Sequence, residues 1–542
     1  MLRNKSLWVE SSLLGVAAVA LLVHGFSMVG DLRIDDAYIT FAYSKNVAHG
    51  HGPIYGADLK VEGYSNFLWM MLVAAGEFVG VSAIHTARVL SCAAYAVVLG
   101  ATHLGARCLA GRIPAFLVTL VLAASTDFHR LIQSGLETVL FCAFLAGGCA
   151  HYLLEDKRQR RWSLLWFTGA ALTRIDGFVP LFLILGLELL RVILSRNKPA
   201  LKGLLLWAAW GVAPVLIFWL WRSWYYGLLF PLPYYAKASL GMLEFERGLD
   251  YVVGGLRETG MWLAALVAAF GLSLRNSRPV VVVAAFVATL AGYVAYVGGD
   301  WMPLNRMLVP LMSPLLVLTA VGVGAALDQA RQLGRKLLAT VAVGSLAVSA
   351  FLALHLNQLT IETPLEAAKV GHTDHLLRHT QGLLDALPYI QAMLRAPGDK
   401  LVTDYGGVYA YGTDASVIEM WGLANRDIAL RGNTEGINAI YGKTCVPCYA
   451  EFNPDYFHSV TPLLRGDHDF RSVSQLVGEI FQGRAIDRVI GLRKNYVVGR
   501  VRRPSSGQTL WFLERKRNDV SFEPRQVGQL LVDYPDFKKK GA

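Results

Sequence analysis

Residues 32–41 read Leu-Arg-Ile-Asp-Asp-Ala-Tyr-Ile-Thr-Phe, and they follow an apolar run at about residues 8–28. The adjacent carboxylates Asp35 and Asp36 therefore lie just beyond the end of a potential membrane span. Residues 61–66, Val-Glu-Gly-Tyr-Ser-Asn, continue the same polar stretch. Ionisable groups at a membrane boundary are costly and usually have a role, so this stretch is the first candidate for a functional site.

The composition is that of a membrane protein. Among the 542 residues, 54% are hydrophobic and the mean hydropathy is +0.40, which leaves too little polar surface for a soluble globule. The net charge of +11 is divided among short runs of Lys and Arg between apolar segments, rather than gathered on one amphipathic face. Such runs are typical of cytoplasmic loops and argue against nucleic-acid binding. We predict a polytopic α-helical membrane protein.

The basic runs also give an orientation. With Lys and Arg on the cytoplasmic side, about eleven spans place the N-terminus inside and the C-terminus outside. The run at 67–80 would reverse every later loop if it crossed the membrane, so we predict an interfacial or re-entrant helix there. The expected spans lie near residues 10–28, 86–106, 113–127, 136–154, 162–175, 177–194, 203–222, 260–274, 279–297, 305–327 and 337–356.

The polar composition after about residue 356 predicts a second domain. We expect a transmembrane domain at 1–356, with a first external loop at 29–85, and an external α/β domain at 357–542. Within it, Cys445 and Cys448 favour a local disulfide in an oxidising compartment, although a redox pair is the alternative. The pattern predicts a helix at Leu376–Leu394 and strands at Lys400–Tyr405, Ser416–Trp421, Arg488–Leu492, Tyr496–Arg500 and Thr509–Leu513.

The predicted topology gathers the polar loops on the outer face. A carboxylate beside another at the membrane surface suits a general base, so Asp36 and Asp35 are the catalytic candidates; an N-cap for the following helix is the alternative. Arg174, Lys237 and Arg306 could hold a phosphate, or extend to lipid headgroups. The other candidates for the same pocket are Glu62, Tyr64, Asn66, His129, Glu137, Asp176 and Asp300.

A metal ion is left open by the sequence. His49, His51 and His129 lack the spacing of a metal site, and surface or structural histidines are the more frequent case. A divalent cation held by Asp35 or Asp36 together with Glu62 or Glu137 is the alternative.

Several motifs resemble those of the GT-C membrane glycosyltransferases, and most closely the arabinofuranosyltransferase group that includes the mycobacterial terminal arabinan enzyme. The specific block is the first external loop, and the later blocks are short. The matching segments are residues 35–41 (Asp-Asp-Ala-Tyr-Ile-Thr-Phe), 50–53, 61–69, 133–138, 173–177, 298–301, 404–408 and 421–423.

This resemblance implies a sugar donor built on a polyprenyl phosphate and transfer to a glycan or protein acceptor outside a bacterial inner membrane. The family's acidic catalytic residue falls on Asp35 or Asp36, and Asp36 is preferred for its place near the helix start. Mannosyl, aminoarabinosyl and oligosaccharyl relatives share the scaffold, so the sugar, the acceptor and the anomeric outcome stay open. A transporter or a non-catalytic binder of lipid-linked glycan is the alternative, but the sequence has no inverted repeat.

Overall fold

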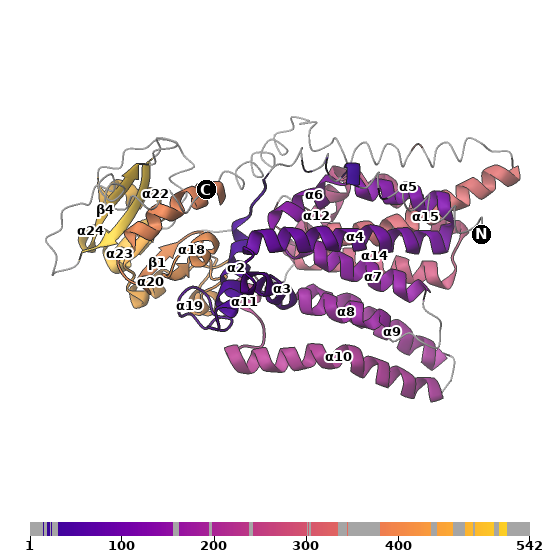
Figure 1. The fold of residues 1–542 in the computed structure, drawn as a ribbon, viewed down its shortest axis with the longest axis horizontal. Coiled ribbons are helices and arrows are strands. Elements are labelled where there is room, and N and C mark those ends of the chain that lie inside the picture. Colours follow the sequence, from indigo (N-terminus) through magenta and orange to yellow (C-terminus); the bar gives the residue numbers. More distant parts are fainter. Residues whose placement is uncertain are drawn as a thin grey trace.

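The structure is a computed structural model, and its elements are arranged as an elongated molecule with a helical bundle and a C-terminal α/β domain at opposite ends (Figure 1). It describes residues 31–154, 162–194, 198–237, 242–300, 302, 305–333, 380–434, 442–458, 472–480, 483–502 and 509–516, with a few isolated positions at 15–26 and 344.

Five described helices are long and apolar enough to cross a membrane, and two bent pairs raise the number to seven. The prediction of a multi-pass helical membrane protein is therefore confirmed. The five are α4 (Ala83–Ala110), η1 with α9 (Ile175–Leu194), α10 (Lys198–Tyr226), α14 (Arg278–Val297) and α15 (Val309–Leu333). The bent pairs are α5 (Arg112–Ala123) with α6 (Thr126–Ser134), and α12 (Met242–Glu258) with α13 (Met261–Leu274).

The expected count of eleven spans is not reached within the described residues. The segments at 10–28 and 337–356 lie almost wholly outside them. Helix α7 (Thr138–Leu154) has 17 residues and α8 (Trp162–Thr173) has 12, which are fewer than the roughly 20 that a bilayer needs. Helix α3 (Phe67–Phe78) has 12 residues, as expected for a segment that does not span.

Helix α15 is the centre of the bundle. Its apolar window is completely buried, and it packs against α13, α4, α14, α5 and α7. Helix α10 is the opposite case, because only 17% of its window is buried inside the protein. It lies along one edge of the bundle in Figure 1. A continuous apolar helix with so little protein around it is suited to contact with lipid.

The C-terminal domain contains a five-stranded mixed sheet in the order β2-β1-β3-β5-β4. Strand β1 (Lys400–Thr403) is parallel to β2 (Ser416–Glu419) and to β3 (Tyr456–His458). Strand β5 (Thr509–Arg515) runs antiparallel to β3 and to β4 (Tyr496–Arg502). The predicted strands that correspond to β1, β2, β4 and β5 are confirmed.

Two details of this domain differ from the prediction. The strand expected at Arg488–Leu492 is wrong, because α23 (Gly483–Ile490) and α24 (Leu492–Asn495) occupy that segment. The apolar residues of α23 recur with the helical period, and Ile486 is buried against the sheet. The three-residue strand β3 was missed because it is too short for a period of two to be visible. The expected helix is present over residues 380–393.

Cys445 and Cys448 form the predicted disulfide, with Cα atoms 5.3 Å apart. Cys445 precedes α20 (Val446–Phe452), and Pro447 in the first turn suits a helix start. Both cysteines belong to the core of the C-terminal domain. Of the other four, Cys142 and Cys149 are buried, as expected of packing residues, whereas Cys92 is half-buried and Cys108 is exposed.

The C-terminal domain is docked on the loop at residues 29–85, the first external loop of the prediction. Helix α18 (Gly407–Gly412) packs against α2 (Asp35–Ala48), and Lys45 Nζ donates to the carbonyl of Tyr411 at 3.0 Å. The Tyr411 hydroxyl in turn donates to Glu77 at the end of α3 at 2.7 Å. A Cβ at Gly407 would lie 2.2 Å from the carbonyl oxygen of Asp35, so only glycine permits this approach. The boundary expected at 356/357 lies outside the described residues.

Candidate functional site

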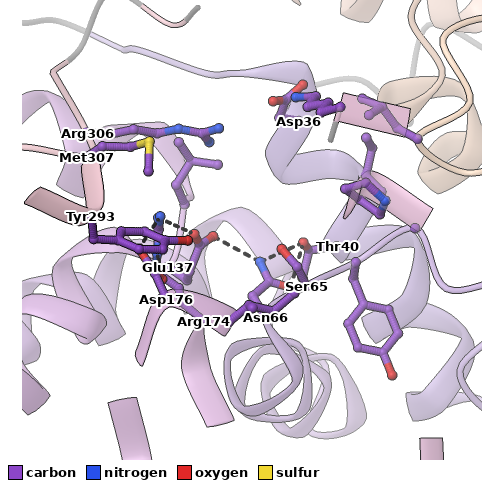
Figure 2. Close-up of a pocket in the computed structure, with 18 residues that line it drawn as sticks. Asp36, Thr40, Ser65, Asn66, Glu137, Arg174, Asp176, Tyr293, Arg306 and Met307 are labelled. Atoms are coloured by element: carbon purple, nitrogen blue, oxygen red, sulfur yellow. Dashed lines mark hydrogen bonds and ion pairs between the residues drawn. The ribbon is translucent and has the colours of Figure 1, made fainter. Parts of the chain in front are cut away.

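A cavity of about 200 Å³ lies where the first loop, the adjoining ends of several bundle helices and the C-terminal domain meet (Figure 2). We call it the Asp36 cavity. Eight of the twelve predicted site residues line it, and they come from six separate segments of the chain. The lining residues are Asp36, Ile39, Thr40, Gly63, Tyr64, Ser65, Asn66, Leu136, Glu137, Arg174, Ile175, Asp176, Pro233, Lys237, Tyr293, Arg306, Met307 and Leu423.

A chain of polar contacts forms one wall of the cavity. The amide of Asn66 donates to Thr40 Oγ1 at 3.0 Å and to Glu137 Oε2 at 2.9 Å. The other oxygen of Glu137 accepts from Arg174 at 3.1 Å, and Arg174 forms a bidentate pair with Asp176 at 2.8 and 2.9 Å. The contacts from Thr40 to Arg174 are visible in Figure 2. They hold this wall in a fixed arrangement before any ligand arrives.

The adjacent carboxylates have different surroundings. Asp35 is buried and accepts from the backbone N–H groups of Gly407 at 3.2 Å and Val408 at 2.8 Å. Its burial raises the pKa to about 7, which outweighs the lowering by these two amides. Neither carboxylate caps α2, because its N-cap is Ile34; Asp35 instead receives the first amides of α18. Asp35 therefore joins two domains.

Asp36 is turned to the cavity instead. It lies opposite Arg306 and the Glu137 wall in Figure 2, on the far side of the open space. Adjacent helical residues point about 100° apart, which explains why one carboxylate can be fixed while the other stays accessible. Thr40 follows one turn after Asp36, so the two share a face of α2.

Two of the three predicted cations remain available to an anion. Arg306 contacts one carboxylate, that of Asp300. Burial raises the pKa of Asp300, but Arg306 and Lys237 lower it further, so the balance is downward. Lys237, at the end of α11 (Leu232–Lys237), forms no ion pair with another described residue. Arg174 is different, since two carboxylates already surround it.

Four predicted site residues do not line the Asp36 cavity, and one of them is Asp35, described above. Glu62 forms a bidentate ion pair with Arg222 of α10, at 2.9 and 3.0 Å from Nε, and both side chains are almost completely buried. It fastens the first external loop to α10. His129 is buried in α6 and packs edge-on against Tyr95, with ring centroids 6.1 Å apart. Asp300 forms an ion pair with Arg306, which does line the cavity.

A smaller pocket adjoins the cavity on the side of the C-terminal domain. It is about 40 Å³ in volume and shares Asp36, Ile39 and Leu423 with the cavity. The domain contributes Asp404, Tyr405, Gly406, Glu419 and Trp421.

Glu419 is a buried acidic group of this pocket. It accepts from the backbone N–H groups of Trp421 at 2.9 Å and Leu423 at 2.7 Å. Burial raises its pKa to about 8, although these amides act in the opposite direction. Near neutral pH the pocket therefore carries less negative charge than its composition indicates.

Within the described part of the chain, no group of three or more His, Cys, Asp or Glu side chains is arranged to hold a metal ion. The carboxylates are instead engaged separately, Asp35 with α18, Glu62 with Arg222 and Glu137 with Asn66 and Arg174.

Several lining residues were not predicted. Thr40 could have been found from its position four residues after Asp36 on the same helix. Tyr293 is a polar group inside the apolar run of α14, which is another signal. Met307 carries no sequence signal, because ordinary apolar residues become cavity walls only through packing; Leu423 belongs to the matching segment 421–423, but its side chain alone does not indicate a site.

Solved structures of other proteins share this fold. No protein-family model and no curated protein sequence matches the chain. Among solved structures, ArnT from Cupriavidus metallidurans, bound to undecaprenyl phosphate, matches with a TM-score of 0.56 and 13% identity, over 83% of this chain and 92% of that one. The oligosaccharyltransferase AglB from Archaeoglobus fulgidus, with an inhibitory peptide and a dolichol-phosphate, matches at 0.52 and 11%, over 95% and 76%.

The arabinofuranosyltransferase AftD from Mycobacteria also matches, with 13% identity, over 94% of this chain and 40% of that one. Its TM-score of 0.49 does not single out the arabinofuranosyl group. All three are GT-C glycosyltransferases. At these identities the likeness concerns the fold, and the chain has the GT-C fold: a helical membrane bundle followed by a mixed α/β domain.

Proposed function

We propose that this chain is a membrane glycosyltransferase that moves a sugar from a polyprenyl-phosphate donor to a glycan or protein acceptor. The observation that carries the proposal is the Asp36 cavity, in which an accessible carboxylate faces two cations at the junction of bundle and C-terminal domain. Two proteins with this fold have been solved with undecaprenyl phosphate and with dolichol-phosphate, which supports a lipid-linked donor.

Asp36 is the proposed general base. It is the member of the carboxylate pair that lines the cavity, whereas Asp35 is engaged by the amides of α18. It would accept the proton of the acceptor hydroxyl while the acceptor oxygen bonds to the anomeric carbon of the donor sugar. The bond from that carbon to the phosphate oxygen breaks, and polyprenyl phosphate leaves.

Arg306 and Lys237 are the proposed partners of the donor phosphate. Negative charge grows on the leaving phosphate in the transition state, and preorganised cations stabilise it. Arg306 retains donor capacity beyond its contact with Asp300, and Lys237 offers three donors. Arg174, included in the prediction, is better suited to fixing Glu137 and the wall of the cavity, because Asp176 and Glu137 already neutralise it.

The orientation belongs to the same proposal. The positive-inside distribution supports a cytoplasmic N-terminus, about eleven spans and an external C-terminal domain. A bacterial inner membrane is proposed from the family resemblance. A reporter fused after Ala542 should be active only outside the cytoplasm. Cytoplasmic activity would contradict the orientation and the external site.

Arabinofuranose is the proposed sugar, on the strength of the resemblance in the first external loop. The decisive experiment incubates purified protein with synthetic polyprenyl phosphates that carry arabinofuranose, mannose or aminoarabinose, and with a panel of glycan and peptide acceptors. A mass gain in the acceptor identifies the sugar. Asp36→Asn should abolish this gain, whereas Asp58→Asn, an exposed carboxylate of the same loop, should preserve it.

The outcomes separate the alternatives. Full turnover by Asp36→Asn would remove the proposed base. Donor binding without product from any donor would favour a non-catalytic binder of lipid-linked glycan. Arg306→Gln and Lys237→Gln should weaken donor binding, and a normal donor affinity in both variants would contradict their role.

A further inference from the structure

The C-terminal domain has a second, larger cavity that takes no part in the proposed reaction. Its volume is about 450 Å³, which is within the range of small-ligand sites. It lies between the end of α20, helix α24 and strands β4 and β5. In Figure 1, α24 and β4 occupy the end of the molecule farthest from the bundle. We call it the basic cavity.

Three cations line the basic cavity, and none of its lining residues is acidic. They are Lys494, Arg515 and Lys516. Arg515 is paired with Asp455 at 2.6 Å, so one positive charge is compensated. The ammonium of Lys516 donates to the carbonyl of Lys494 at 2.8 Å, which holds it at the rim without neutralising it. Neither lysine forms an ion pair with a described residue, so two lysine charges remain for a ligand.

The remaining lining combines polar side chains with the apolar residues Pro454, Val489 and Ile490. Tyr496 donates its hydroxyl to the carbonyl of Pro454 at 2.7 Å, and Tyr449 donates to Met420 at 3.3 Å. Both rings are almost fully buried, so they offer no face on which a nucleic-acid base could stack. Asn495 is exposed at the rim; its amide donates one hydrogen bond to the carbonyl of Ile490 at 2.7 Å, and its second N–H and its oxygen remain for a ligand.

We propose that the basic cavity binds an anionic saccharide, a sugar unit that carries a carboxylate or a phosphate. The cations supply charge-assisted hydrogen bonds and the amide supplies neutral ones, which is the combination that such a sugar needs. A lipid headgroup is disfavoured because the cavity lies away from the bundle. Because the cavity is separate from Asp36, this binding does not rest on the proposed transfer.

The test uses the full chain in detergent or nanodiscs and measures binding by calorimetry. The probes are an oligogalacturonate, a poly(glycerol phosphate) oligomer and a neutral oligomannose. We expect at least one of the two anionic probes to bind, with an affinity that falls as salt is added. The neutral probe should bind much more weakly. The preferred anionic probe distinguishes a carboxylate from a phosphate ligand.

Lys494→Gln is the diagnostic variant, because the carbonyl that holds Lys516 is kept. It should weaken binding of the anionic probe by about tenfold, as loss of one charge-assisted contact does. Arg488→Gln, an exposed cation of the same domain that does not line the cavity, is the matched control and should leave the affinity unchanged. Absence of binding by both anionic probes, equal binding of the neutral one, or equal loss in the two variants would overturn the proposal.

Discussion

Replacing Asp35 by alanine should loosen the docking of the C-terminal domain. The carboxylate accepts from two buried amides, those of Gly407 and Val408. Without it, each amide loses its acceptor in a buried place, which costs about 1–3 kcal/mol per group. The local opening of α18 should therefore become easier by about 2–6 kcal/mol. Since 1.4 kcal/mol corresponds to a factor of ten, we expect opening to increase by about 30-fold or more.

Hydrogen exchange followed by mass spectrometry is the assay, on a peptide that covers residues 404–412. Asp36→Ala is the matched control, because it removes the neighbouring carboxylate, which lines the cavity instead of receiving the amides of α18. The peptide should lose protection in Asp35→Ala and keep it in Asp36→Ala. Equal protection in both variants, or loss in Asp36→Ala alone, would refute the assignment of different roles to the two carboxylates.

Three other predictions concern stability. Glu62→Gln should lower the free energy of unfolding by about 3–5 kcal/mol, because the charge of Arg222 stays buried without its partner. Adding Arg222→Met should restore part of the lost melting temperature. An unchanged melting temperature in the single variant would contradict the buried pair. Gly407→Ala should lower the melting temperature, because the added Cβ would meet the α2 backbone. Gly382→Ala, with open space around the added Cβ, should not lower it. Equal melting temperatures of the two variants would refute the close approach. The neutral carboxyl of Glu419 stabilises the fold fully below the unfolded pKa of about 4.5, and this contribution is lost as the pH rises through the folded pKa of about 8. The melting temperature of Glu419→Gln should therefore vary less with pH across this range than that of the unchanged protein. The same pH dependence in both proteins would disprove the raised pKa.

The local features of this protein were predictable from sequence. The apolar runs gave the membrane class, because hydrophobicity is a property of each segment alone. Four of five strands were predicted, since alternation is visible within a few residues. The disulfide was also predictable, because Cys445 and Cys448 are only three residues apart. Strand β3 and the helix at residues 483–490 were not, because short elements take their conformation from the sheet beside them.

The roles of the charged residues depended on contacts between distant segments. Asp35 meets Val408 across 373 positions, and Glu62 meets Arg222 across 160. No local pattern encodes such pairs. The sequence therefore offered both carboxylates of the first loop as catalytic candidates, with a preference for Asp36 that rested only on its place near the helix start, and it included Glu62 among the pocket residues. The sequence alone determined that acidic and basic groups gather just outside the apolar runs. The tertiary structure decided which of them are paired and buried, because a charge removed from water must find its partner wherever the packed chain brings one.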